Sequence, residues 1–530
     1  MDEPRFNNPL LVDLPDRRRI EPPVRLSESK IWSLNQRFYA AEGVGAWLTH
    51  GIPSYITSNA GLARAYARIM FQYVETVAHE GEGPVHIVEL GSGTGRFAFL
   101  VLTHLLEFAE AYGEPTRPFR YVMTDFSDQN LPWWRAHPEL APFVASGQLD
   151  FALYDGAVGP IHDRLMVADE PFVESIGRAP AIFIANYVLD SLPHDLFFIE
   201  EEGELRELHV GLTSLHDLDA EAFHLDGVEL FFERGPVTDA PYSDPELSRV
   251  VVDYAAQLGG GPLSVPTSAA EGVARFERLT QGRFLFLTAD KGPLQPDPQM
   301  HAASTHLDHH GSTSMNVNLD LLAEIAASRG ARCVRGSSNA VGLSLLGLVM
   351  GPGAASTAST ARAWLQEASP LAAYSLKEVE PGTLPPTTVL GVLQLVGWDP
   401  DMVSVHAEAL VDAAKSDDPK VRDEVRTGLL RAERLVFTGH QHRDNAFAFG
   451  RVWYALDEDE RARNAFAESI RTYGVSAPRL FNFAISLYAA QEDPAVVRRC
   501  LEDAIALDPG LDVAHDALAR LNHHEGPRQP

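Results

Sequence analysis

Residues 86–97 read His86-Ile-Val-Glu-Leu-Gly-Ser-Gly-Thr-Gly-Arg-Phe97. An apolar run ends in an acid, three glycines follow at alternate positions, and a second apolar run has helical character. This order predicts a buried parallel strand, a tight glycine turn and a helix. Glycine permits positive φ and lets a ligand approach the backbone closely, and the first turn of a helix has free N–H groups. We therefore expect a small polar ligand at this loop.

The spacing of the glycines narrows the class of ligand. It is G-x-G-x-G, not the dinucleotide pattern G-x-G-x-x-G, and the Gly-Lys-Ser/Thr of a phosphate-binding P-loop is absent. The pattern resembles motif I of the Rossmann-like S-adenosylmethionine (SAM) methyltransferases. That resemblance implies that Gly91, Gly93 and Gly95 lie against the methionine half of SAM, and that Glu89 sets the loop and meets the ammonium group. The alternative is an ordinary glycine-rich βα turn.

Composition and charge exclude several functions. With 530 residues and 45% apolar residues, the chain is expected to form roughly two to four globular domains. The formal net charge of -30 opposes binding to nucleic acid. A basic or neutral partner such as a protein tail or peptide suits this charge better.

The absence of a long apolar run, the N-terminal residues and the cysteine usage together favour a cytoplasmic protein. No apolar run approaches the ~20 residues needed to cross a bilayer, so no membrane association is expected. The N-terminus lacks the order of a secretion signal. Cys333 and Cys500 lie far apart and form neither a disulfide framework nor a zinc spacing.

Two further predicted strands end in acids. The strand 119–124 ends at Asp125, whose carboxylate could accept hydrogen bonds from both ribose hydroxyls of a nucleoside. Asp125 could instead cap the next helix. The strand within 147–156 ends at Asp155, and in methyltransferases of this type an acid here accepts a hydrogen bond from the adenine amino group. Asp155-Gly156 is also a common turn.

Residues 181–186 predict a short central parallel strand, and polar side chains follow it directly. Such groups face the ligand crevice in open α/β sheets. We therefore place Asn186, Tyr187 and Asp190 on the acceptor side, with Asp190 or His194 as a base. Asp190 could alternatively brace the turn before Pro193.

The remaining segments contribute less to the site. Residues 200–245 alternate in short polar and apolar runs and predict an inserted antiparallel patch. Residues 301–310 are rich in histidine, but they are predicted to form a loop without a helical i, i+4 pair, and we expect no metal site.

Taken together, residues 50–350 resemble the MidA-like methyltransferases. This family includes a mitochondrial arginine methyltransferase that takes part in the assembly of respiratory complex I. The residues that carry the resemblance are Thr57 and Ser58, the loop 89–95, the segment 186–193 and the run 311–330. The resemblance implies SAM as cofactor, with Thr57, Ser58 and Asn186 near it. The family's glutamate beside the asparagine is Tyr187 here, and its Pro-Glu after Thr-Ser is replaced by Asn59-Ala60.

The sequence divides into four segments. We expect an N-terminal arm and helix over 1–50, a methyltransferase domain over 51–352, a linker over 353–400 and a helical domain over 401–530. In the last segment Gly450 and Ile485 lie 35 positions apart, which resembles the ~34-residue period of tetratricopeptide (TPR) repeats. A generic helical bundle is the alternative.

The leading hypothesis is an α/β protein with a Rossmann-like class I methyltransferase sheet, an inserted β patch and a TPR-like all-α domain. It would transfer a methyl group from SAM to a protein or peptide docked by the repeats. A homo-oligomer is possible, because repeats also mediate self-association. The rival hypotheses are a small-molecule methyltransferase of secondary metabolism and a non-catalytic SAM-binding assembly protein.

Overall fold

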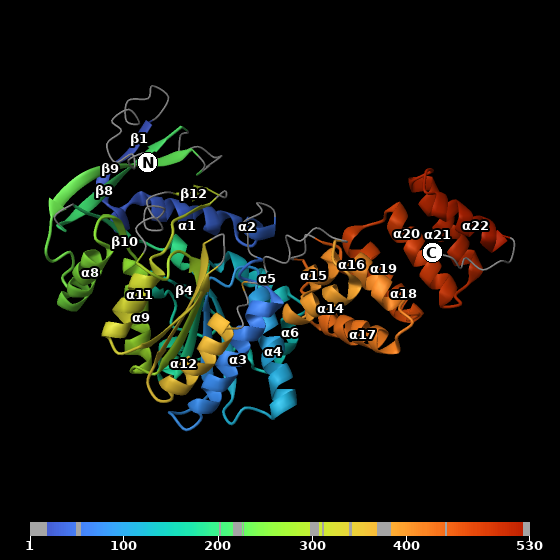
Figure 1. The fold of residues 1–530 in the computed structure, drawn as a ribbon, viewed down its shortest axis with the longest axis horizontal. Coiled ribbons are helices and arrows are strands. Elements are labelled where there is room, and N and C mark those ends of the chain that lie inside the picture. Colours follow the sequence, from blue (N-terminus) through green and yellow to red (C-terminus); the bar gives the residue numbers. More distant parts are fainter. Residues whose placement is uncertain are drawn as a thin grey trace. The chain divides into compact units, whose positions relative to one another are not determined.

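The computed structural model places most of the chain in two compact units, Met1–Leu371 and Ala372–Pro530. In Figure 1 the first unit is coloured from blue to yellow and the second from orange to red. The boundary between the units falls inside the segment 353–400. The residues that the structure describes are 18–48, 55–200, 203–215, 225, 227–296, 307–309, 312–338, 342–367, 371, 383–439 and 443–522.

Unit 1 is built on an eight-stranded sheet whose central strands run parallel. Strand β15 is antiparallel to β11 and to β14. The apolar runs predicted as parallel strands occupy the centre, where both faces are covered. Across the sheet the order is β14 (Arg332–Ser338), β15 (Leu343–Met350), β11 (Phe284–Lys291), β6 (Ala181–Asn186), β2 (Val85–Leu90), β3 (Phe119–Asp125), β4 (Leu149–Asp155) and β5 (Gly159–Pro160).

The strand order reverses at β2, which makes β2 the topological switch point of the sheet. The chain proceeds from β2 to β3 and β4 on one side, and then returns to β6 on the other side of β2. In open α/β sheets the crevice outside the carboxyl ends of the strands at such a point binds ligands. The residues that follow β2, β3, β4 and β6 are those singled out in the sequence, so the topology brings them to one edge.

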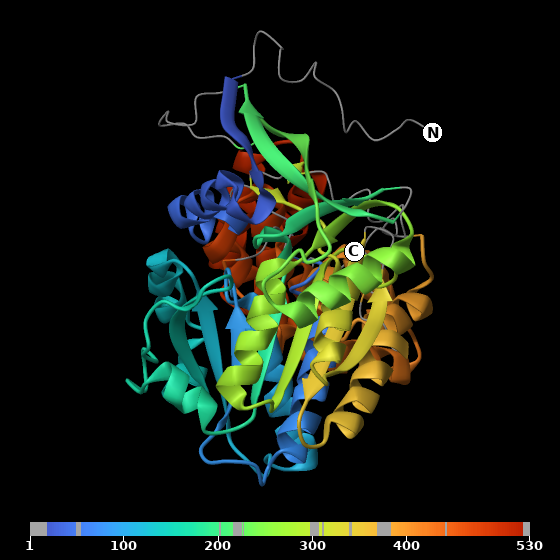
Figure 2. The same ribbon diagram turned by 90° about the vertical axis from the view of Figure 1, so that its left-hand side faces the viewer.

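Helices lie on both faces of this sheet (Figure 2). Helix α3 (Ala60–Thr76) packs against α4 (Arg96–Tyr112). Asn59 caps α3, because its Oδ1 accepts a hydrogen bond from Leu62 N at 3.0 Å. Helices α7 (Phe172–Gly177), α9 (Thr267–Thr280) and α11 (Leu319–Ser328) contribute to one buried core with β2 and β6.

A second, five-stranded sheet contains the antiparallel patch predicted for residues 200–245. The N-terminal arm is partly wrong as a prediction, because β1 forms a strand paired with β8. Strand pairing gives the backbone of β1 the hydrogen bonds that an arm would leave to water. The strands are β1 (Arg18–Arg25), β8 (Leu205–Ser214), β7 (Asp195–Ile199) and β10 (Gly261–Val265) in that order, with β9 (Val228–Val237) also paired to β8.

Unit 2 consists of helices, and from α18 onward each helix packs against its successor. Gly450 on α18 lets α19 approach closely, because a Cβ there would stand 2.6 Å from the Phe466 ring. The helices are α14 (Pro386–Leu395), α15 (Pro400–Val405), α16 (Ala407–Ala414), α17 (Pro419–Arg434), α18 (Asn445–Ala455), α19 (Asp459–Tyr473), α20 (Ala477–Ala489), α21 (Pro494–Leu507) and α22 (Asp512–Asn522).

The predicted linker 353–400 is partly helical. Helix α12 (Ala354–Arg362) packs on α3 and β14, and α14 begins within the same segment. The small residues that suggested a domain boundary include alanines. Alanine has a high helix propensity, and here the helix is stabilised by packing against α3 and β14. The histidine-rich segment lies mostly outside the described residues. Among the helices described, none combines the length and the hydropathy that crossing a bilayer requires.

Candidate active site

The glycine loop between β2 and α4 is packed so tightly that side chains would clash. Gly91, Gly93 and Gly95 have φ of 60°, 53° and 87°, in the left-handed region. A Cβ at Gly91 would stand 2.9 Å from Cγ2 of Val188, and one at Gly95 would stand 2.7 Å from Cε of Met123. The alternating glycines therefore form a turn that fits against the loop after β6.

One side of this loop is fixed by hydrogen bonds from large side chains. Trp134 donates its Nε1–H to the carbonyl of Gly93 at 2.8 Å, and Trp133 donates to that of Thr94 at 3.0 Å. Both tryptophans belong to α5 (Leu131–Ala136). Gly91, by contrast, is exposed. The loop is thus held rigid from behind and open at Gly91.

Glu89 is buried beneath the loop with an unsatisfied oxygen. Its side chain is 4% exposed, and Oε2 has no hydrogen-bond partner in the described part of the chain. Burial raises the pKa of Glu89 to about 7. A buried carboxylate oxygen without a donor is costly, so a cationic or hydrogen-bonding ligand group would stabilise it.

Asp125 lies buried at the end of β3. Oδ2 accepts from Nδ2 of Asn130 at 2.8 Å, and Oδ1 accepts from Ser127 N at 3.3 Å. Burial raises the pKa of Asp125 to about 6. Ser127 caps the short helix that follows, since its side chain accepts from Gln129 N. Asp125 is therefore not the N-cap, and its carboxylate is held in a fixed orientation.

Asp155 is half-buried at the end of β4. Its Oδ1 accepts from the backbone N–H groups of Ala157 (2.7 Å) and Val158 (3.1 Å), as an Asp-Gly turn requires. Oδ2 accepts from Nε2 of Gln36 at 3.2 Å. The ring of the preceding residue, Tyr154, is buried in the core against Phe172 and does not face the site.

Asn186 joins separate elements rather than facing the acceptor. Its Oδ1 accepts from Tyr66 Oη at 3.1 Å and from Ala289 N at 3.0 Å, and its Nδ2 donates to Thr57 O at 3.5 Å. Thr57 is buried and Ser58 half-buried at the start of α3. Thr57 therefore lies close to the end of β6, where its carbonyl group accepts a hydrogen bond from Asn186.

Tyr187 has an unusual backbone conformation for a large residue. Its φ is 51°, which costs free energy in any residue but glycine and persists where surrounding contacts impose it. Its N–H donates to Ala289 O at 3.0 Å. The ammonium of Lys291 lies 6.0 Å from the centre of its ring. The strain occurs directly at the carboxyl end of β6.

Asp190 follows in the short helix η4 (Leu189–Ser191) and is 4% exposed. Its Oδ1 accepts from Ser191 Oγ at 3.1 Å. Burial raises the pKa of Asp190 to about 6, against the opposing effect of the Lys291 charge. The sequence analysis missed Asp290, which accepts from Val188 N at 3.2 Å and Leu189 N at 2.8 Å. Asp290 thus shapes the loop that presents Asp190.

His194 is poorly placed for the predicted role of base. It is 1% exposed, its Nε2 donates to Leu189 O at 3.1 Å, and its ring lies 5.5 Å from that of Trp32. Burial lowers the pKa of His194 to about 4. The imidazole is therefore neutral and supports the loop and helix α1 (Lys30–Glu42). Of the two predicted bases, Asp190 remains.

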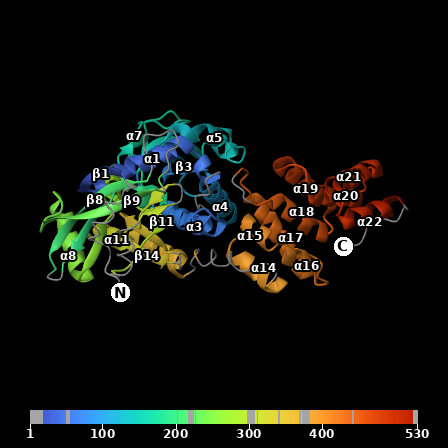
Figure 3. The ribbon, with the colours of Figure 1, turned by 90° about the horizontal axis from the view of Figure 1, so that it is seen from above.

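Helix α1 was not predicted to belong to the site, yet it reaches the site from above the sheet (Figures 2 and 3). Besides the Gln36 bond to Asp155, Tyr39 donates to Ser312 Oγ at 3.0 Å. Asn35 exchanges hydrogen bonds with the backbone of Thr313 at 2.9 and 3.1 Å. A sequence signal existed, because Asn35 is a polar residue on the apolar face that carries Ile31, Leu34 and Phe38.

Residues 65–312 match the model of a family described as "putative S-adenosyl-L-methionine-dependent methyltransferase". The match lies within unit 1, which is similar to this methyltransferase family over these residues. The matched residues contain the glycine loop, Asp125, Asp155 and the segment from Asn186 to His194. SAM is therefore the cofactor of the methyltransferase domain, as the sequence analysis expected.

Two solved structures that match this chain come from Burkholderia thailandensis. An uncharacterized protein is 13% identical over 63% of this chain and 88% of its own, with a TM-score of 0.38. A second member of its superfamily, bound to S-adenosyl-homocysteine (SAH), is 15% identical over 60% of this chain and 75% of its own, with a TM-score of 0.36. No curated protein matches the sequence. The assignment rests on the family model.

Proposed function

We propose that the chain is a SAM-dependent methyltransferase that acts on a protein or peptide acceptor, and that its helical second unit docks this acceptor. In this proposal the eight-stranded sheet is a Rossmann-like class I methyltransferase sheet. Its strand order and the antiparallel β15 between β11 and β14 support that. Unit 2 is a TPR-like array, which the close packing at Gly450 and the consecutive helix contacts support.

The residues at the carboxyl ends of the strands suit SAM. The exposed Gly91 lets the methionine half approach the backbone, and the unsatisfied Oε2 of Glu89 can accept from its ammonium group. Asp125 would hold the ribose hydroxyls and Asp155 the adenine amino group. When bound, SAM supplies an electrophilic methyl group on its sulfonium.

The observation that carries the catalytic part of the proposal is the buried Asp190 after β6. Its raised pKa makes it a proton acceptor for a neutral nitrogen or oxygen near physiological pH. Strained Tyr187 lies in the same loop, and Lys291 at the end of β11 places its ammonium 6.0 Å from the centre of the Tyr187 ring. Much of the remaining rate enhancement would come from positioning the acceptor.

The net charge of the chain and its helical second unit support a protein or peptide acceptor. A net charge of -30 favours encounter with basic or neutral partners. Helical repeats offer extended surfaces for peptides and proteins, whereas a small metabolite needs none. A protein or peptide acceptor uses both features.

Transfer of labelled methyl groups tests the acceptor class. The full chain is incubated with tritium-labelled SAM and a host lysate, and the products are resolved by size. We expect label in protein or peptide fractions, because the acceptor is proposed to dock on unit 2. A chain in which Asp190 is replaced by asparagine serves as the control for background labelling. Label found solely in small molecules would overturn the protein acceptor.

The affinity for SAH is expected to increase with pH between 6 and 8. Because the pKa of Glu89 is about 7, its carboxylate becomes ionised as the pH rises through that value, and only the ionised form attracts an ammonium group. The dissociation constant should be about tenfold higher at pH 6 than at pH 8. Calorimetric titrations of the wild type and of Glu89→Gln check this, since the variant should lose most of the pH dependence. A pH-independent wild type would argue that Glu89 does not meet the ammonium.

A further inference from the structure

The helices α1 and α2 (Gly45–Leu48) and the turn between them lie against Asp155, the glycine loop and Asn130, which bonds Asp125. Gln36 donates to Asp155, the predicted adenine acid. The Trp47 ring lies beside the glycine loop, 3.4 Å from where a Cβ of Gly93 would stand. A Cβ at Gly43 would stand 3.2 Å from Oδ1 of Asn130, whose amide donates to Asp125.

The same segment reaches the acceptor side. The ring of Tyr39 stacks on that of Trp47, with centres 5.7 Å apart. Its hydroxyl donates to Ser312 Oγ. Burial is the main cause that raises the pKa of Tyr39 to about 12, and the negative charges of Asp190 and Asp125 add to it. Tyr39 is therefore a neutral phenol that contacts Trp47 and Ser312.

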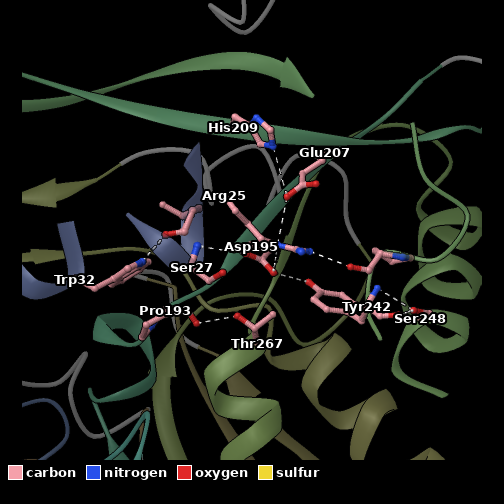
Figure 4. Close-up of polar contacts among 12 residues, drawn as sticks. Arg25, Ser27, Trp32, Pro193, Asp195, Glu207, His209, Tyr242, Ser248 and Thr267 are labelled. Carbon is pink, nitrogen blue, oxygen red and sulfur yellow. Dashed lines mark hydrogen bonds and ion pairs between the residues drawn. The ribbon is translucent and has the colours of Figure 1, made fainter. Parts of the chain in front are cut away.

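Buried polar contacts anchor the start of this segment to the acceptor loop (Figure 4). Arg25 of β1 forms an ion pair with Asp195 at 3.0 Å and with Glu207 at 3.3 Å. Asp195 also accepts from Ser27 N at 3.3 Å and from Tyr242 Oη at 2.9 Å. Because Asp195 directly follows the segment 186–194, the entry into α1 is fixed to the loop that carries Asp190.

From these contacts we infer that α1 and α2 form one wall of the SAM site, with Trp47 as a cofactor-binding residue and Gln36 as a residue that positions Asp155. The inference rests on the proposed function. Trp47 covers the glycine loop where the methionine half lies, and Gln36 orients Asp155 toward adenine. Tyr39 supports the Trp47 ring by stacking on it. Ligand sites bury most of their ligand's surface, and the strand ends alone supply one side of such an enclosure.

Titration of the full chain with SAH tests the wall directly. For Trp47→Ala we expect the dissociation constant to rise about tenfold or more, mainly through faster dissociation, because an apolar contact is removed from the bound ligand. For Gln36→Ala we expect a rise of about three- to tenfold, since Asp155 loses a hydrogen bond that fixes its orientation. Gln36 is exposed, so this variant keeps its fold even if Trp47→Ala does not.

The matched control is Ser33→Ala, an exposed position on the same helix whose Oγ donates to the backbone carbonyl of Lys30 at 2.9 Å. It should bind SAH as the wild type does. If the wild type binds SAH and both Trp47→Ala and Gln36→Ala bind it with the affinity of the wild type, the proposed role of α1 and α2 is wrong. The proposed function is not affected by that result. If the wild type does not bind SAH, the proposed function itself fails.

Discussion

Replacement of Asp190 by asparagine is expected to slow methyl transfer by about 10²- to 10⁴-fold, the range typical of removing a general base. The side chain is buried at the end of β6, and its raised pKa suits proton transfer near neutral pH. Asparagine keeps its shape and cannot take a proton. The rate is measured with labelled SAM on the acceptor fraction that the wild type methylates.

The affinity for SAH should change little in Asp190→Asn, because Asp190 is assigned to the acceptor. Asp128→Asn provides the same chemical change at an exposed position beside the site and should leave both rate and affinity as in the wild type. A rate for Asp190→Asn within a factor of a few of the wild type would remove Asp190 from the mechanism.

Replacement of Asp125 by alanine is expected to weaken SAH binding by about 1–3 kcal/mol, the cost of leaving hydrogen-bonding groups without a partner. In the structure its carboxylate is oriented by Asn130 and Ser127. The ribose hydroxyls would lose their acceptor, and Asn130 would lose the group that it bonds. Calorimetric titration with SAH at pH 8, where Asp125 is ionised, measures the loss.

Asp125→Asn separates charge from shape in this experiment. It retains one acceptor oxygen, so we expect a smaller loss than for alanine, with thermal unfolding close to that of the wild type. Equal affinity for SAH in the wild type and in Asp125→Ala would mean that the ribose is held elsewhere.

The sheet could be predicted because its signals are local. The runs before Glu89, Asp125 and Asn186 are short and mainly apolar, and each ends in a polar residue near a strand end. Parallel strands are covered on both faces, so such runs are typical of them. The topology then places their ends at one edge, and the predicted site follows.

The roles of individual side chains were harder to predict, because they depend on partners distant in sequence. Asn186, which was expected to face the acceptor, bonds Tyr66 and Ala289, and His194, which was expected as a base, packs on Trp32. Asp290 reaches the loop after β6 from the neighbouring strand. A sequence pattern gives the residue types at a strand end, whereas their orientation depends on tertiary packing.

The pairing of β1 with β8 affects how the protein can be divided for experiments. The family match begins at residue 65, so a fragment trimmed to it would lack β1, α1 and α2. The edge of β8 at residues 209–214 would then be unpaired, and an open strand edge promotes aggregation. A failed cofactor assay on such a fragment would reflect the loss of β1, α1 and α2, and it would not count against cofactor binding by the full chain.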